Sequence, residues 1–317
     1  MKYYQLDSNQ TYSDVQMINQ ANWLHVVDPN DEEKSFLRDE FNLPYDFIYD
    51  ALDRYEMPRF EKYETKEGKV LRLYMMLYPR VKKVMDGYDE LESQPLAIII
   101  TEEITITISA EHPVFLNAII QNETIKQGEQ LTGNHIILDI IWELTQSFVD
   151  ETAKIDKSID EMEQSITKST KSNSFNKLIA IHKNLVYFET GITENDKIIH
   201  KIMESDIYSD DEKGKQLLHD IKVVSNQATT MVHEADQMIS HLSEVFSSVI
   251  SNNLNNIMKV LTSLTIILTI PTIIGGLWGM NIPLPFDEHP FGFVILILLT
   301  IIVSLVTAFW LKKNDYF

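Results

Sequence analysis

A row of threonines recurs along one strongly apolar segment near the carboxyl end of the sequence. Its members follow one another at intervals of three, four and three residues: Thr262, Thr265, Thr269 and Thr272. In an α-helix this spacing places the hydroxyl groups on one face, which we call the threonine face. Polar groups in a membrane segment must find partners, so this face belongs against protein or water. Two interpretations stay open: the face lines a water-filled path, or the hydroxyls bond their own backbone carbonyls and face another helix.

The threonine face lies in the first of two uncharged segments that are each long enough to cross a membrane. The segments cover about residues 260–279 and 291–310, close to the roughly 20 residues that a helix needs to span about 30 Å of hydrocarbon. Lys259 precedes the first, and Lys312 and Lys313 follow the second, whereas the loop between them contains no Lys or Arg. This asymmetry predicts a multi-pass protein of the cell membrane with both termini in the cytoplasm. The alternative is a helical hairpin buried in a soluble core.

Composition excludes several classes of partner and chemistry. The 317 residues include 47 acidic and 27 basic ones, a net charge of −20, and phosphate backbones repel such a body, so we expect no nucleic-acid partner. The chain has no cysteine, which excludes disulfides, thiol nucleophiles and thiolate metal sites. It also shows no Gly-rich phosphate loop and no nucleophile elbow, so we do not expect an enzyme. The amino terminus is polar, and no cleavable signal peptide is visible.

The rest of the chain divides into two further regions. We expect an α+β cytoplasmic domain over residues 1–125, with strands at residues 23–27 and 70–77, a helix at residues 31–41 and a hairpin formed by residues 96–101 and 104–109. Residues 126–258 have a helical period and predict a cytoplasmic stalk of long, coiled-coil-like helices. Residues 259–317 then form the transmembrane domain.

The last stalk helix carries a heptad seam that is sustained for more than four repeats. Its apolar members alternate at spacings of four and three: Leu217, Ile221, Val224, Ala228, Met231, Ala235, Met238, Leu242, Val245 and Val249. Such a seam favours self-association, although it could instead pack only on the two preceding helices of the same chain. Two spans per chain cannot enclose a pore, so a water-lined threonine face also requires several copies around an axis. The second span, with few polar side chains, is expected to be the outer, lipid-facing helix.

A short motif ends the first span. Trp278 is followed by Gly279, Met280 and Asn281, and an aromatic residue before Gly-Met-Asn at this position resembles the CorA family of magnesium channels. The segments at residues 255–262 and 43–61 are also similar to that family, and the resemblance covers essentially the whole chain. The family's usual aromatic residue is Tyr, so Trp278 is a departure at the pore mouth.

The resemblance implies a homopentameric funnel in which the first span lines the pore. Gly279, Met280 and Asn281 would form its outer mouth, where Asn281 carbonyls hold a hydrated Mg²⁺ through its water shell. Further pore positions of the family fall on Asn255, Met258, Leu261, Thr269 and Thr272. An apolar ring of Met258 and Leu261 would gate by dewetting.

The family also senses cytoplasmic Mg²⁺ between subunits, and the matching carboxylates are Asp50 and Asp220. Mg²⁺ is therefore expected both as the transported and as the regulatory ion of a channel driven by the membrane potential. The alternatives are a zinc, cobalt or nickel transporter of the same family and a non-conducting, membrane-anchored coiled-coil sensor. The nine histidines are scattered in the sequence, and His233 and His241 lie two turns apart, so no dedicated transition-metal site is expected.

Overall fold

The computed structural model describes residues 1–6, 12–83, 89–121, 135–166, 172–208, 210–280, 290–314 and 316. It divides into two compact units, residues 1–241 and residues 242–317. The strands are β1 (Lys2–Leu6), β2 (Tyr12–Val15), β3 (Trp23–Val27), β4 (Arg59–Glu64), β5 (Val70–Lys83), β6 (Asp89–Ile100) and β7 (Thr105–Ser109). The α-helices are α1 (Asp31–Phe41), α2 (Tyr45–Tyr49), α3 (Leu116–Ile120), α4 (His135–Ile166), α5 (Ser172–Met203), α6 (Glu212–Trp278) and α7 (Gly292–Lys313). Short 3-10 turns are η1 (Ile18–Gln20), η2 (Asp50–Leu52) and η3 (Asp206–Tyr208).

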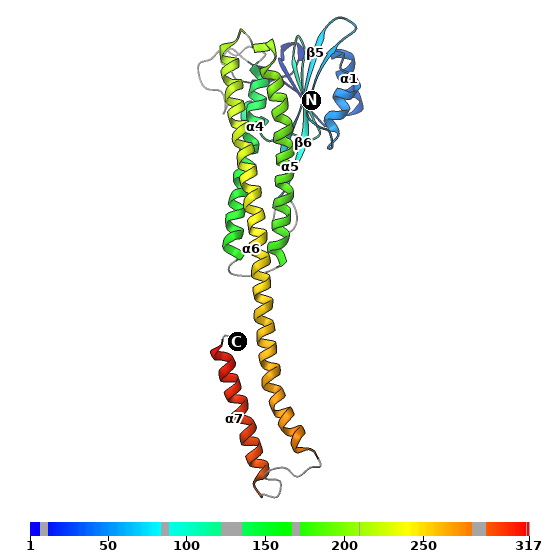
Figure 1. The fold of residues 1–317 in the computed structure, drawn as a ribbon. Helices are drawn as coiled ribbons and strands as arrows, with labels where there is room; N and C mark the ends of the chain where they lie inside the picture. The colour runs from blue at the N-terminus through cyan, green and yellow to red at the C-terminus, as the bar shows by residue number, and fades with distance from the viewer. Residues whose placement is uncertain are drawn as a thin grey trace. The chain divides into compact units, whose positions relative to one another are not determined.

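The first unit contains one seven-stranded sheet in the order β2-β1-β3-β7-β6-β5-β4. Strands β3 and β7 pair in parallel, and all other neighbours pair antiparallel. Figure 1 shows α1 on one side of the sheet and α4 and α5 on the other. The α1 side holds a core of buried apolar side chains from both layers, including Leu37, Phe47, Leu73, Ile99 and Ile106. The mixed sheet followed by long helices confirms the predicted α+β fold class.

Local sequence signals explain where α1 begins and ends. Asn30 precedes the helix, and its side chain accepts a hydrogen bond from the backbone N–H of Glu33, while the Glu33 carboxylate accepts from the backbone N–H of Asn30. This capping box satisfies two donors that the first turn leaves without intrahelical partners. Asn42 then ends the helix in the left-handed region, with φ of 54°. The observed bounds of α1 and β3 are those predicted from the sequence.

Two buried asparagines attach α5 to the sheet. The Asn195 amide accepts a hydrogen bond from the Leu77 N–H at 2.8 Å and donates one to the Leu77 carbonyl at 2.7 Å. Strand β4 stops at Arg59, opposite Met75 of β5, so this amide continues the ladder where the neighbouring strand ends. Asn184 accepts from the Leu91 N–H of β6 at 2.9 Å. Because buried backbone groups need partners, these contacts hold α5 in a fixed register on the sheet.

Helix α6 is a single helix of 67 residues that continues through Pro271. Asp211 caps it by accepting a hydrogen bond from the Gly214 N–H at 3.0 Å. In the first unit its buried stripe follows a heptad spacing: Leu218, Ile221, Ser225, Ala228, Val232, Ala235 and Ile239.

The stripe shares Ile221, Ala228 and Ala235 with the predicted seam, but the members between them are displaced by one residue. Lys222 and Ser225 of α6 both hydrogen-bond to Asp196 of α5, so this stripe packs within the chain. The other members of the predicted seam lie along the edge of the buried stripe, and one of them, Met238, is 45% exposed. The predicted domain borders at residues 125 and 258 stay a prediction.

Candidate functional site

In the second unit, one face of α6 and one face of α7 are covered. On α6 the covered residues recur at spacings of four, three and four, beginning with a fully buried serine: Ser263, Ile267, Ile270 and Ile274. On α7 they include Gly292, Thr300, Ser304, Thr307 and Leu311. The two helices belong to one compact unit, and we infer that these faces lie toward one another. The hydroxyl side chains of α7 thus lie on its covered face, and the exposed side chains from Phe293 to Trp310 are apolar.

The threonine face lies on the opposite side of α6 from this covered face. Each residue of an α-helix turns the chain by about 100°. Thr265 stands two residues from both Ser263 and Ile267, which is about 200° around the helix axis. Thr272 stands in the same relation to Ile270 and Ile274. All four threonines are exposed in the single chain, so α7 does not cover them.

The threonine hydroxyls donate to their own helix. Thr265 bonds the Leu261 carbonyl at 2.8 Å, Thr269 the Thr265 carbonyl at 2.7 Å, and Thr272 the Leu268 carbonyl at 3.1 Å. A hydroxyl has one donor and two acceptor positions. The donor of each of these side chains is already bonded, and its oxygen can still accept hydrogen bonds. Of the two interpretations of the threonine face, the backbone bonding is therefore present, but no helix within the described residues of the same chain covers the face.

The other predicted pore positions on α6 are exposed as well. Met258 is 56% exposed and Leu261 54%, and Asn255 and Thr269 are also accessible. At the end of the helix Gly279 and Met280 are exposed, and the Gly279 N–H bonds the Gly275 carbonyl at 3.0 Å. Asn281 lies outside the described residues.

The apolar side chains of both segments are largely exposed, because the described residues of the chain do not cover them. By length and composition alone, α6 and α7 are each long and apolar enough to cross a membrane, and only 6% of the most apolar stretch of either helix is buried. A hairpin in a soluble core would be mostly buried, so this alternative is wrong. Lipid or further copies of the chain must cover these surfaces.

The two predicted sensing carboxylates occupy separate elements. Asp50 begins η2, and its carboxylate accepts a hydrogen bond from the Arg59 guanidinium at 2.7 Å, with its side chain 33% exposed. Asp220 lies on α6 and is half-buried. Within the described residues, no ion pair joins the two, and no group of three or more His, Asp or Glu side chains could hold a metal ion. A site between neighbouring chains would have to supply the additional ligands.

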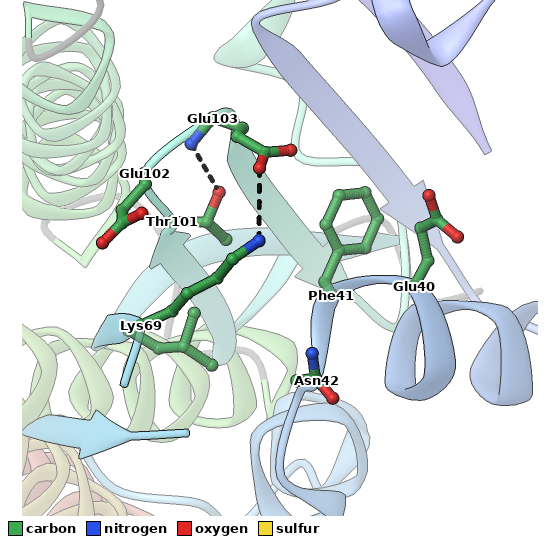
Figure 2. A pocket seen from close by; sticks show the side chains of 8 residues that line it. Glu40, Phe41, Asn42, Lys69, Thr101, Glu102 and Glu103 are labelled. Carbon is green, nitrogen blue, oxygen red and sulfur yellow. Dashed lines mark hydrogen bonds and ion pairs between the residues drawn. The ribbon is translucent and has the colours of Figure 1, made fainter. Parts of the chain in front are cut away.

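A hollow on the sheet domain offers no alternative binding site for an organic molecule. Figure 2 shows it between the end of α1 and the turn that joins β6 to β7. Lys69 reaches across to Glu103 at 3.3 Å, and Glu40, Asn42 and Thr101 stand around it. Its volume of about 30 Å³ is roughly that of one water molecule.

The chain is similar in sequence to a known family of ion transporters. The family described as "CorA-like Mg2+ transporter protein" matches residues 19–313. The cobalt/magnesium transport protein CorA of Methanocaldococcus jannaschii is 20% identical over 298 residues, which cover 93% of this chain and 90% of that protein. The protein of the same name from Thermotoga maritima is 20% identical over 277 residues, covering 85% and 75% respectively.

The solved structures agree on the fold. The complete structure of the CorA magnesium transporter from Methanocaldococcus jannaschii superimposes with a TM-score of 0.80 at 19% identity, covering 100% of this chain and 98% of that one. The cytoplasmic domain of ZntB from Vibrio parahaemolyticus matches with a TM-score of 0.58 at 12% identity, over 80% of this chain and 98% of that domain. At these identities the likeness concerns the fold.

Proposed function

The chain belongs to the CorA family of divalent cation transporters, and on that premise we propose that it forms a homopentameric Mg²⁺ channel in the cell membrane. Five copies of α6 surround the pore, α7 lies outside them toward lipid, and both termini are in the cytoplasm. Cations enter at Gly279, Met280 and Asn281 and pass the threonine face toward Asn255.

The observation that carries this proposal is the position of the threonine face. It is the polar side of an apolar helix, and it points away from the only other candidate span in the described residues. A polar face in a membrane belongs against water or protein, and the described part of one chain offers no third span. Copies arranged around an axis supply both, because each threonine face then lines a shared aqueous path.

The hydrogen bonding of the threonines suits a hydrated cation. The water molecules around Mg²⁺ point their hydrogens outward and need acceptors, while Mg²⁺ itself sheds these waters reluctantly. The hydroxyls of Thr265, Thr269 and Thr272 donate to backbone carbonyls and turn their remaining acceptor capacity outward. Rings of such oxygens would hold the water shell without replacing it.

The stalk supports self-association. Helix α6 carries apolar side chains in two overlapping heptad registers, the predicted seam and the buried stripe. Only the buried stripe packs fully within the chain. In the register that remains, Met238 is 45% exposed, and Leu217, Val224 and Met231 are half-buried. Burial of such surface against neighbouring copies is favourable in proportion to its apolar area. The stalk can therefore hold the five first spans together.

Uptake into proteoliposomes tests the proposed function. A membrane potential of about 100 mV, negative inside, favours entry of a divalent ion by about 4.6 kcal/mol, twice the value for one elementary charge. We expect Mg²⁺ uptake by the parent protein to rise with the imposed potential, to exceed that of protein-free liposomes, and to exceed Zn²⁺ uptake under the same conditions. Zn²⁺ uptake without Mg²⁺ uptake would instead favour a zinc transporter, and no uptake of either would favour a non-conducting scaffold.

Closure by internal Mg²⁺ is assigned to Asp50, Asp220 and the apolar ring of Met258 and Leu261. An ion shared by Asp50 of one copy and Asp220 of the next offsets the repulsion of an acidic body and stabilises the closed assembly. The Arg59 guanidinium already pairs with Asp50, so a second carboxylate is needed to hold a cation there.

Two sets of variants test this assignment. Asp50→Asn with Asp220→Asn is expected to conduct at internal Mg²⁺ concentrations that close the parent, and Met258→Ala or Leu261→Ala is expected to leak at those concentrations. Asp46→Asn with Glu244→Gln removes the same charge from α2 and α6 and is expected to close normally. If the first double variant and the control respond identically to internal Mg²⁺, the two carboxylates are ordinary surface acids.

A further inference from the structure

Two histidines that are 87 residues apart in the sequence meet beside β3, an interior strand of the sheet. His25 lies on β3 and is 2% exposed, whereas His112 lies in the segment between β7 and α3 and is exposed. His25 Nε2 and His112 Nδ1 are 3.1 Å apart, and the two rings meet edge to face at 65°. One nitrogen of each imidazole therefore faces the other from a different element of the fold.

The outward nitrogen of each ring has its own partner. His25 Nδ1 lies 2.9 Å from the Thr107 hydroxyl oxygen, and His112 Nε2 lies 2.9 Å from Asn117 Oδ1. The Thr107 hydroxyl also accepts a hydrogen bond from Trp23 Nε1, and its two lone pairs allow it to accept from His25 as well. Both outward nitrogens can thus carry the proton, which leaves the inward nitrogens of His25 and His112 as lone-pair donors.

This is the arrangement that ligating histidines usually have. A metal-bound imidazole almost always donates its other N–H to an oxygen acceptor, which fixes the tautomer and aims the ring. Metal–nitrogen bonds measure about 2.0–2.1 Å, so two nitrogens 3.1 Å apart subtend an angle of about 98° at a shared ion. That angle lies between the octahedral and tetrahedral values. We propose that His25 and His112 bind a transition-metal ion such as Zn²⁺, Co²⁺ or Ni²⁺ between His25 Nε2 and His112 Nδ1.

The ligand chemistry of the pair favours this class of metal. Mg²⁺ is a hard ion that prefers oxygen ligands, and two imidazole nitrogens do not supply them. Zn²⁺, Co²⁺ and Ni²⁺ bind neutral imidazole well.

The ion would be held by two protein ligands, with water completing its coordination on the exposed side of His112. The site is distinct from the threonine face, because it is built from β3, β7 and α3 of the sheet domain. It does not depend on the pore, so its occupancy can be measured whether or not the protein conducts. A rotation of the exposed His112 ring aims its lone pair at the ion while Asn117 keeps the opposite nitrogen paired.

Zn²⁺ binding to the full-length protein in detergent tests the proposal. An excess of Mg²⁺ occupies the carboxylate sites, and a competing chromophoric chelator reports the affinity for Zn²⁺. The parent is expected to bind one Zn²⁺ per chain that Mg²⁺ does not displace. Loss of an acceptor beside a ligating histidine typically costs about 10–100-fold in affinity, so Asn117→Ala should weaken Zn²⁺ within that range and His112→Ala at least as much.

Three controls make the outcome decisive. His241→Ala removes an exposed histidine of α6 and should leave the Zn²⁺ affinity unchanged. Thermal unfolding without Zn²⁺ verifies that His112→Ala folds, and Zn²⁺ should raise the unfolding temperature of the parent but not of this variant. X-ray absorption of the parent should show two imidazole ligands on the bound ion. Parent affinity retained by a folded His112→Ala protein, or a bound ion without imidazole ligands, would overturn the proposal.

Discussion

Replacing Asn281 with Ala is expected to abolish Mg²⁺ uptake while leaving the oligomer assembled. The residue ends the Gly-Met-Asn motif, three residues after α6 ends at Trp278. In the proposed channel, its side-chain carbonyl is the first oxygen ring that an entering ion meets. A methyl group in its place offers the water shell of Mg²⁺ no acceptor, so the ion would lose its binding site at the mouth.

Uptake into proteoliposomes and cross-linked oligomer size should be measured on the same preparation. Asn314→Ala provides the matched control, because Asn314 follows α7 and its side chain donates a hydrogen bond to the Trp310 carbonyl of its own helix. We expect this control to transport as the parent does. An assembled Asn281→Ala protein with parental uptake would remove Asn281 from the pore mouth.

The sequence predicted most of the local structure because strong, local signals determine it. The capping box at Asn30 and the left-handed Asn42 enclose α1, and two long uncharged segments predict the spans without any tertiary information. The hairpin of β6 and β7 followed from two apolar segments on either side of an acidic turn. These features require no knowledge of distant contacts.

The phase of the stalk seam could not be predicted, for a specific reason. Apolar residues occur in adjacent pairs along α6, such as Leu217 with Leu218, Met231 with Val232 and Met238 with Ile239. A heptad pattern fits either member of each pair. The chain buries the second phase, which includes the polar Ser225, because the Ser225 hydroxyl donates to Asp196 of α5 at 2.9 Å. The choice between the two heptad registers of α6 therefore depends on where α5 lies, which the sequence of α6 does not contain.

Long-range contacts account for the other omissions. The parallel pairing of β3 with β7, the attachment of α5 through Asn195, and the meeting of His25 with His112 each join residues more than 80 positions apart. A single histidine in a strand carries no signal for a metal site. His25 and His112 are brought together only by the fold, because the sheet places the segment after β7 beside β3.

Cysteine accessibility on α6 tests most directly whether the threonine face lines the conduction path. The chain contains no cysteine, so one introduced thiol is the only reactive one. Thr269→Cys places it on the threonine face, Ile267→Cys on the covered face, and Leu264→Cys on an exposed apolar flank. Each variant is reconstituted, and Mg²⁺ uptake is measured before and after treatment with a positively charged, membrane-impermeant thiol reagent. A bulky positive group in a cation path blocks it sterically and by repulsion.

We predict that the reagent abolishes uptake by Thr269→Cys, fastest at low internal Mg²⁺ when the channel is open, and leaves Ile267→Cys and Leu264→Cys unaffected. Uptake that persists in fully labelled Thr269→Cys, or that is blocked through Leu264→Cys instead, would contradict a pore lined by the threonine face.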